Sequence, residues 1–561
     1  MLPKTQIIID YAGFFNSEPP KDRLALIKSF SKKHILAEFA GLNYWLKPKL
    51  ELTYDHSLKF QIDKLRYFTG IDVGLQQFYL SRYQNFIEDE SHYQIIFNRA
   101  CNLLAMEEIL TCPDMKDDDS FVMNDREVWH RLLQFIFSIN SEITKVRIPA
   151  EDQITLELIN ANTLTLNELN IETDLFLTPF RGLKLLSFLK EDKKYGTYLS
   201  DYFETKVKSD PEYFIFQIIN AYISKKNINP DLEFLLFLKE DIGIFEYLSN
   251  STSISTDHIK LLSIKKAPFF KRIEKDNQIR YMVLDFSFLL EKCYNFFIND
   301  FWFDFLKNEK GLNHYDEYRG ELGLFFQSYV AYWFKEIFRF NPSCTMRLFG
   351  ESKIATSHGE IELSDIYVRK NNKIIIGEVK FTALYDKEKY ADDFLGFYKN
   401  NRGRFYSDFG IDQTVNSIKN LVEYLNKFDS KAELFEELIL YPVVVVNEKA
   451  LQTPLIAPLF NQRFQELIAN EHFTSFNIKP LTILHVSDLE RIEPYVDETK
   501  AELFFDLIES HLQNQDFFMP FYLTLNTHLK GRKYSKQILT ELGNLSLKFN
   551  PEQIGGDNDF S

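Results

Sequence analysis

The chain has few cysteines and no long run of apolar residues. Its 561 residues contain four cysteines, which are scattered and form no C-x-x-C pair: Cys101, Cys112, Cys293 and Cys344. This usage gives no zinc-site spacing and fits a reducing compartment. No run of about 18 apolar residues occurs, so no transmembrane helix is expected, and the opening MLPKTQIIIDYAGFF lacks the apolar core of a signal peptide. We therefore expect a cytoplasmic protein without a membrane partner.

The chain also has fewer basic residues than acidic ones. The chain has 65 Lys and Arg against 81 Asp and Glu, which gives a net charge of −16. That balance argues against a surface broadly adapted to nucleic acid, although it leaves room for a local basic groove. Hydrophobic residues make up 45% of the chain, so substantial cores can form. The length suggests about two to four domains.

The periodicity of apolar residues predicts an α/β core, a mixed central sheet flanked by helices, together with a large, mainly helical N-terminal region and a small helical C-terminal segment. We expect a recognition or scaffold region over residues 1–310, divided near residue 150, a core domain over 311–497, helices over 498–550 and a disordered tail over 551–561. Within the first region, residues 147–185 alternate Thr, Asn and Leu, which favours strands or short repeat-like turns. No catalytic motif lies in the first 300 residues, so a protein partner is the expectation there.

The most informative stretch is EIELSDIYVRKNNKIIIGEVKF, residues 360–381. It predicts a strand over Ile361–Val368, a turn over residues 369–372 and a strand over Lys373–Phe381. Alternation places Glu378 and Lys380 on one face of the second strand, and an in-register hairpin places Asp365 beside Glu378. Buried carboxylates without partners are costly. A divalent cation between them would remove that cost and supply chemistry.

Further elements follow in a regular order around this hairpin. Apolar spacing predicts a helix before it, a strand leading into it, and then an alternation of helices and strands after it. The expected elements are a helix over 321–338, a strand over 345–349, a helix over 412–428, a strand over 438–447, a helix over 459–470 and a strand over 481–486. A last helix is expected to start with Ser487 as its cap and Glu490 at the capping-box position.

This order, with Asp365 on one strand and Glu378-Val379-Lys380 on the next, resembles the PD-(D/E)XK nuclease superfamily over about residues 320–495. The resemblance implies that Asp365, Glu378 and the carbonyl of Val379 bind Mg²⁺ or Mn²⁺, which prefer oxygen ligands. It also implies that Lys380 holds the attacking water or the developing negative charge. Gln413 stands where many members place a glutamine near the metal or the scissile strand.

Two positions depart from the family pattern. The usual G-x-x-F-E of the first helix reads Gly323-Leu324-Phe325-Phe326-Gln327 here, so Gln327 takes the place of the acid. Glu321 could serve instead; if neither side chain reaches the site, a two-carboxylate metal site is the alternative. Four residues after Gln413, where one branch has Tyr, this chain has Ser417.

Two basic clusters could contact phosphate. One combines Lys399, Arg402 and Arg404 with Phe405 and Tyr406, and the other is HLKGRKYSK, with Lys530, Arg532, Lys533 and Lys536. The alternatives are a solvated loop for the first cluster and a turn between helices for the second.

The leading hypothesis is a magnesium-dependent nuclease that cleaves DNA, with restriction or antiviral defence suggested by analogy. One alternative is a nucleic-acid-binding or protein-interaction scaffold with a degenerate, inactive nuclease fold, motivated by Gln327 and the net charge. Another is a helical interaction protein whose salt-bridged hairpin has no chemistry.

Overall fold

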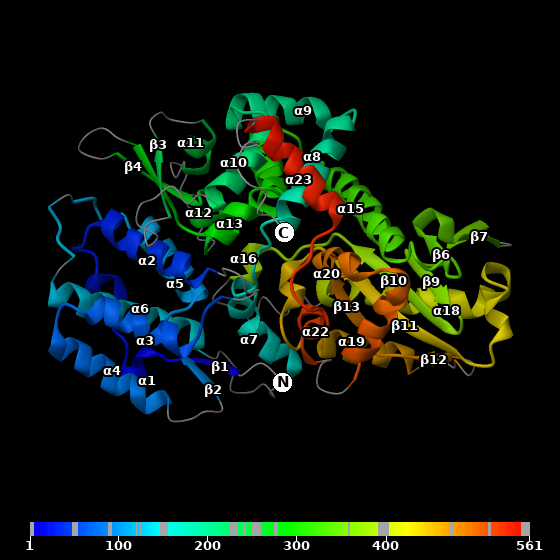
Figure 1. Cartoon of the computed structure of the whole chain (residues 1–561), viewed down its shortest axis with the longest axis horizontal. Helices are drawn as coiled ribbons and strands as arrows, with labels where there is room; N and C mark the ends of the chain where they lie inside the picture. Colours follow the sequence, from blue (N-terminus) through cyan, green and yellow to red (C-terminus); the bar gives the residue numbers. More distant parts are fainter. Residues whose placement is uncertain are drawn as a thin grey trace. The chain divides into compact units, whose positions relative to one another are not determined.

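The chain forms two compact units in a computed structural model (Figure 1). Unit 1 comprises Met1–Arg147, Glu172–Gly311 and Leu545–Ser561; unit 2 comprises Ile148–Ile171 and Leu312–Asn544. The structure describes residues 5–47, 54–87, 92–118, 120–123, 125–145, 155–223, 234–238, 243–249, 260–273, 279–356, 359–390, 403–469, 471, 473, 476–513 and 518–550. The predicted tail at 551–561 lies outside them.

Unit 1 is mainly helical, with two small sheets. Its helical elements are α1 Tyr11–Phe15, η1 Arg23–Leu26, α2 Lys32–Leu46, α3 Leu58–Thr69, α4 Val73–Ile87, α5 Arg99–Thr111, α6 Arg126–Thr144, α8 Leu177–Glu191, α9 Tyr195–Tyr202, η2 Phe203–Val207, α10 Pro211–Ile223, α11 Gly243–Ser249, α12 Leu262–Lys266, α13 Phe286–Glu291, α14 Asn295–Asn299 and η4 Asp300–Lys307. Its strands are β1 Thr5–Ile8, β2 His92–Ile95, β3 Leu235–Leu238, β4 Phe269–Ile273 and β5 Ile279–Val283. β1 pairs with β2 in parallel, and β3, β5 and β4 form an antiparallel sheet in that order. No described helix is long and apolar enough to cross a membrane.

The strands or turns expected over residues 147–185 are wrong where the structure describes this stretch. It forms α7 Leu156–Leu169, which belongs to unit 2, and then the start of α8. Thr155 caps α7 by accepting the N–H of Leu158. Asn160 and Thr163 bond the carbonyls four residues back, so these polar side chains are satisfied inside a helix. The predicted division near residue 150 therefore differs from the observed one, in which residues 148–171 join unit 2.

Unit 2 is built on a six-stranded mixed sheet. The strands are β6 Thr345–Leu348, β9 Ile366–Lys370, β10 Lys373–Lys380, β11 Leu438–Val446, β12 Phe476–Ile478 and β13 Thr482–His485, and a separate hairpin pairs β7 Lys353–Thr356 with β8 Gly359–Glu362. The order across the sheet is β12-β11-β10-β9-β6, and β13 also pairs with β11. β10 runs parallel to β11 and antiparallel to β9. The carboxyl ends of β10, β11 and β13 therefore meet at one edge, where Lys380 pairs with Val446 and Val446 with His485.

Helices cover both faces of this sheet. The helical elements of unit 2 besides α7 are α15 Tyr315–Ile337, η5 Phe349–Ser352, α16 Asp386–Lys389, η6 Arg404–Asp408, α18 Ile411–Phe428, η7 Ala432–Leu434, η8 Lys449–Gln452, α19 Ile456–Ile468, α20 Val486–Ile492, η9 Glu493–Tyr495, η10 Glu498–Lys500, α21 Leu503–His511, α22 Phe521–His528 and α23 Lys536–Phe549, whose last residues belong to unit 1. The predicted segment over 498–550 is thus not a separate unit.

The two faces have different cores. Ile376 of β10 and Val444 of β11 pack with Ile418 of α18 in one apolar cluster. On the other face, Tyr441 of β11 contacts Phe505 of α21, with ring centroids 6.1 Å apart. α15 packs on α21, because its Phe334 and the residue that follows the helix, Phe338, each lie against Phe504 with ring centroids 5.7 Å apart. α18 and α15 therefore cover opposite faces, and side chains that share a face with Ile376 point toward α18.

Two predicted details near the hairpin are wrong. The strand expected over Ile361–Val368 is divided between β8 and β9, which belong to different sheets. The backbone changes partner between the two strands: the Leu363 N–H donates to the Ser352 carbonyl (3.0 Å), whereas the Asp365 carbonyl already accepts the N–H of Phe349 (2.8 Å) in continuation of the β6–β9 pairing. At the last predicted helix, α20, His485 rather than Ser487 is the cap, and Asp488 rather than Glu490 completes the capping box.

Candidate active site at the end of β10

Glu378 and Lys380 lie at the end of β10, a largely buried strand inside the sheet of unit 2. β10 is paired on both sides, and its isoleucines Ile374 to Ile376 are fully buried. Glu378 pairs with Val444, and since Val444 faces α18, Glu378 and Lys380 face α18 as well. The Lys380 Nζ donates to Glu378 Oε2 at 2.9 Å. The sheet thus holds a carboxylate and an ammonium group side by side on the face that α18 covers.

Asp365 completes a cluster of two carboxylates and one ammonium. Its Oδ2 accepts the N–H of Val379 at 2.8 Å and lies 3.7 Å from the Lys380 Nζ. Gly377 pairs with Ile366, so the next cross-strand position places Asp365 beside Glu378. The three side chains are largely buried, with 13%, 8% and 17% of Asp365, Glu378 and Lys380 exposed.

The environment of Asp365 favours its protonated form. Burial, followed by the charge of Glu378, raises the pKa of Asp365 to about 7, although Lys380 and the Val379 N–H act in the opposite direction. Two carboxylates that share one ammonium leave an excess of negative charge in a low-dielectric place. The cluster therefore has an electrostatic reason to accept a further cation.

The start of α18 supports this cluster through two residues. The Ser417 Oγ donates to Glu378 Oε1 at 2.8 Å, so each carboxylate oxygen of Glu378 has its own donor. Gly410, which precedes α18, has φ +83°. A Cβ at Gly410 would lie 2.6 Å from the Lys380 Cε and 3.2 Å from the Glu378 Cβ. Only glycine fits both the backbone conformation and the space at this position.

Two predicted site residues, Gln413 and Glu321, are not bonded to the cluster in the described part of the chain, and neither is Gln327. Gln413 is exposed in the first turn of α18, one turn before Ser417. Within the part of the chain that the structure describes, neither Gln413, Glu321 nor Gln327 forms a hydrogen bond or an ion pair with the cluster. For Glu321 and Gln327 the helix explains the difference: α15 lies on the other face of the sheet, where Phe326 packs on Phe381 with ring centroids 5.4 Å apart.

The oxygen ligands at this site are of the kind that a hard divalent cation prefers, but only two of them are carboxylates. Carboxylate oxygens of Asp365 and Glu378 are ligands that Mg²⁺ and Mn²⁺ accept, and the Val379 carbonyl directly follows Glu378 in sequence. Among the described residues, no three His, Cys, Asp or Glu side chains form a group that could hold a metal ion. A cation here would need water or substrate oxygens for its other positions.

The structure describes the second basic cluster in full and the first cluster only in part. Lys399 and Arg402 lie outside the described residues. Lys530, Arg532, Lys533 and Lys536 are all exposed. Their loop connects α22 to α23 and is fixed by a hydrogen bond from the Tyr495 hydroxyl to the Gly531 carbonyl.

Sequence reasoning missed the supporting roles of Ser417 and Gly410. Ser417 stands four residues after Gln413, so helical spacing alone places both near one side of α18. Gly410 directly precedes the helix, a position where glycine is common for conformational reasons alone. Neither signal by itself distinguishes a site residue from an ordinary helical one.

No protein-family model matches the chain, and no curated protein or solved structure matches it. The class is therefore defined by the molecule itself: a mixed α/β unit with a carboxylate–lysine cluster at the end of a central strand, linked to a mainly helical unit.

Proposed function

We propose that unit 2 is a metal-dependent nuclease of the PD-(D/E)XK type that hydrolyses phosphodiester bonds in DNA. The observation that carries the proposal is the meeting of Asp365, Glu378 and Lys380 at the end of β10. Unit 1 would then recognise the substrate or a protein partner.

Hydrolysis forms a bond from phosphorus to a water oxygen and breaks the bond to one sugar oxygen, which takes up a proton. A bound Mg²⁺ supplies Lewis acidity and lowers the pKa of water. Asp365 and Glu378 would hold that ion, and the Val379 carbonyl would add an oxygen ligand. The Lys380 ammonium would stabilise the negative charge that develops on the phosphate oxygens. Ser417 keeps the Glu378 carboxylate in one orientation.

The test is cleavage of plasmid DNA, linear DNA and RNA by the full chain in Mg²⁺, Mn²⁺ or EDTA. We expect metal-dependent cleavage of DNA that falls by about 100-fold or more in Asp365→Asn, Glu378→Gln and Lys380→Ala. Lys500→Ala is the matched control, because Lys500 is exposed and lies away from this cluster in sequence. Undiminished cleavage in the three variants would refute the proposal, as would inactivity of wild type with bound metal.

A second candidate is a scaffold that binds nucleic acid or protein with an inactive nuclease fold. It is favoured by the lack of a third acidic ligand among described side chains and by Gln327 at the position of the expected acid. Nucleic-acid binding without cleavage, equal in wild type and Glu378→Gln, would select this candidate.

A further inference from the structure

α7 enters unit 2 from a distant part of the chain. The segment Ile148–Ile171 belongs to unit 2, whereas the residues before and after it belong to unit 1. Leu164 of α7 lies in the same apolar cluster as Ile411 of α18. The Asn160 side chain donates to the Leu455 carbonyl at 3.1 Å. α7 is therefore an integral part of the face of unit 2 that α18 covers.

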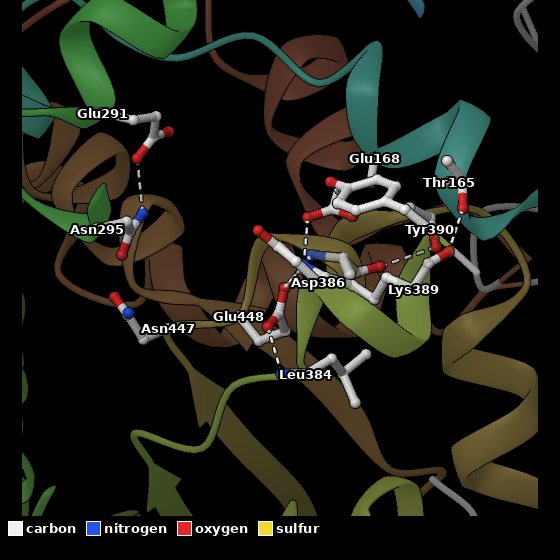
Figure 2. Close-up of polar contacts among 12 residues, drawn as sticks. Thr165, Glu168, Glu291, Asn295, Leu384, Asp386, Lys389, Tyr390, Asn447 and Glu448 are labelled. Carbon is white, nitrogen blue, oxygen red and sulfur yellow. Dashed lines mark hydrogen bonds and ion pairs between the residues drawn. The ribbon is translucent and has the colours of Figure 1, made fainter. Parts of the chain in front are cut away.

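The C-terminal end of α7 forms hydrogen bonds and an ion pair with the segment that follows β10 (Figure 2). Glu168 Oε1 lies 2.7 Å from the Lys389 Nζ, and Glu168 Oε2 accepts the Tyr390 hydroxyl at 3.2 Å. The Thr165 Oγ1 donates to the Lys389 carbonyl at 2.6 Å. Only 5% of the Lys389 side chain is exposed. These three contacts attach α16 and the residue after it to α7.

Glu448 connects the same cluster to the end of β10. Its Oε1 lies 3.3 Å from the Lys389 Nζ, and its Oε2 accepts the N–H of Leu384 at 2.7 Å, as Figure 2 shows. The neighbouring Asn447 N–H donates to the Lys380 carbonyl at 3.4 Å. Glu168, Lys389 and Glu448 thus form a buried chain of charges that reaches the backbone of Leu384, and the residue before Glu448 bonds the backbone of Lys380.

The amino end of α7 holds the chain that leads into α18. Glu157 accepts a hydrogen bond from the Tyr406 hydroxyl in η6. Four residues later stands Gly410, the glycine that packs against Lys380 and Glu378. α7 is therefore bonded at two places, Lys389–Tyr390 and Tyr406, to the chain that runs from Lys380 to Gly410.

A gain in folding stability does not by itself explain why Glu168, Lys389 and Glu448 are buried together. A buried ion cluster is often no more stabilising than apolar residues of similar volume, but it is strict about geometry. Burial lowers the pKa of Lys389, yet Glu168 and then Glu448 outweigh it and raise this pKa well above its usual range. The lysine stays charged, so both carboxylates are held in defined positions.

We propose that α7 positions the candidate nuclease site, with Glu168, Lys389 and Glu448 as positioning residues on the Lys380 side and Glu157 with Tyr406 on the Gly410 side. The inference rests on the proposed function.

The test uses the full chain carrying Glu168→Gln, Thr165→Val or Tyr406→Phe. Thr165→Val and Tyr406→Phe each remove one hydrogen bond and leave no buried charge unpaired, so they carry the test if Glu168→Gln does not fold. Glu466→Gln is the matched control, because Glu466 is 54% exposed on α19. Three quantities are measured: kcat and KM for DNA cleavage, the Mg²⁺ concentration at half-maximal rate, and amide hydrogen exchange over residues 376–390.

For Glu168→Gln we expect kcat to fall and the Mg²⁺ midpoint to rise, each by about 10-fold or more, with KM unchanged. Exchange near Leu384 should accelerate, and the two milder variants should change in the same direction. A loss of thermal stability with an unchanged Mg²⁺ midpoint would show a merely structural role and overturn the inference.

The two proposals fail in different ways. If wild type cleaves DNA and all three variants match it, α7 has no positioning role and the nuclease assignment stands. If wild type binds metal but does not cleave, the nuclease assignment falls, and unchanged exchange over residues 376–390 in the variants would overturn the role of α7 as well.

Discussion

Each oxygen of the Glu378 carboxylate has a separate donor, and the two donors come from different parts of the chain. Lys380 is two residues away on the same strand, whereas Ser417 belongs to α18. The lysine contact follows from strand alternation, but the serine contact depends on how α18 packs on β10. Ser417 is thus the residue whose substitution tests the packing of the site without removing a charged group.

We expect Ser417→Ala to reduce DNA cleavage by about 10-fold or more, because outer contacts of this kind orient the groups that bind metal. The free energy of unfolding should fall by about 1–3 kcal/mol, since Glu378 Oε1 loses its donor in a buried place. Steady-state kinetics and chemical denaturation measure the two effects.

Two further substitutions test whether the effect is specific to the Ser417 hydroxyl. Ser417→Thr keeps the hydroxyl and should retain activity, and Asn416→Ala, at an exposed position of the same helix, should change neither quantity. Activity lost equally in Ser417→Ala and Asn416→Ala would contradict the role given to Ser417.

At the scale of elements, the loop between α22 and the start of α23 gathers exposed basic side chains in unit 2. Lys530, Lys533 and Lys536 are exposed, and none of these lysines forms an ion pair with another described residue. The loop is not an extended tail, because Tyr495 binds the Gly531 carbonyl and its ring lies 5.1 Å from the Lys533 Nζ. Fixed cations beside an aromatic ring suit the backbone of a nucleic acid.

If this loop contacts DNA phosphates, the variant Lys530→Gln/Lys533→Gln/Lys536→Gln should bind DNA more weakly at low salt. Each lost phosphate contact should reduce the slope of log K against log salt concentration by about 1. Fluorescence anisotropy from about 50 to 200 mM salt measures this slope.

The matched control changes net charge by the same amount elsewhere in unit 2. Lys427→Gln/Lys431→Gln/Lys500→Gln replaces three exposed lysines and should leave the slope nearly unchanged. Equal slopes for the two triple variants would show that the loop acts only through the overall charge of the chain.

At the scale of the whole molecule, the chain crosses between the two units more than once. Residues 148–171 leave unit 1 for unit 2, and Leu545–Ser561 return to unit 1. In unit 1, the Phe549 ring lies 5.0 Å from the Tyr213 ring and 5.4 Å from the Phe216 ring, measured between centroids. The end of α23 is therefore part of the structure of unit 1.

We expect Phe549→Ala to destabilise unit 1 by about 1–2 kcal/mol, because a half-buried ring with two aromatic partners is lost. Leu547→Ala, at a side chain that is 52% exposed on the same helix, should change stability by less than about 0.5 kcal/mol. Thermal unfolding followed by fluorescence compares them. Equal shifts for the two variants would mean that the aromatic contact contributes nothing.

Local order along unit 2 follows from the sequence by itself. The apolar runs at β10 and β11 and the periodic spacing in α15 and α18 identify these elements, although α15 begins at Tyr315 and not at Glu321. The positions of Asp365, Glu378 and Lys380 on one face also follow, because alternation along a strand and pairing across a tight turn are local properties. Prediction was weaker where polar residues alternate, as in α7, because Asn and Thr can bond back to their own helix.

Only the tertiary structure decided which distant residues surround these three side chains. Helical spacing cannot tell that Ser417 rather than Gln413 meets Glu378, that α15 lies on the opposite face, or that α7 bonds Lys389. Such contacts join segments far apart in the sequence, and burial and packing of whole elements select them. The sequence by itself determined the acids and the lysine of the candidate site, and the fold determined what holds them in place.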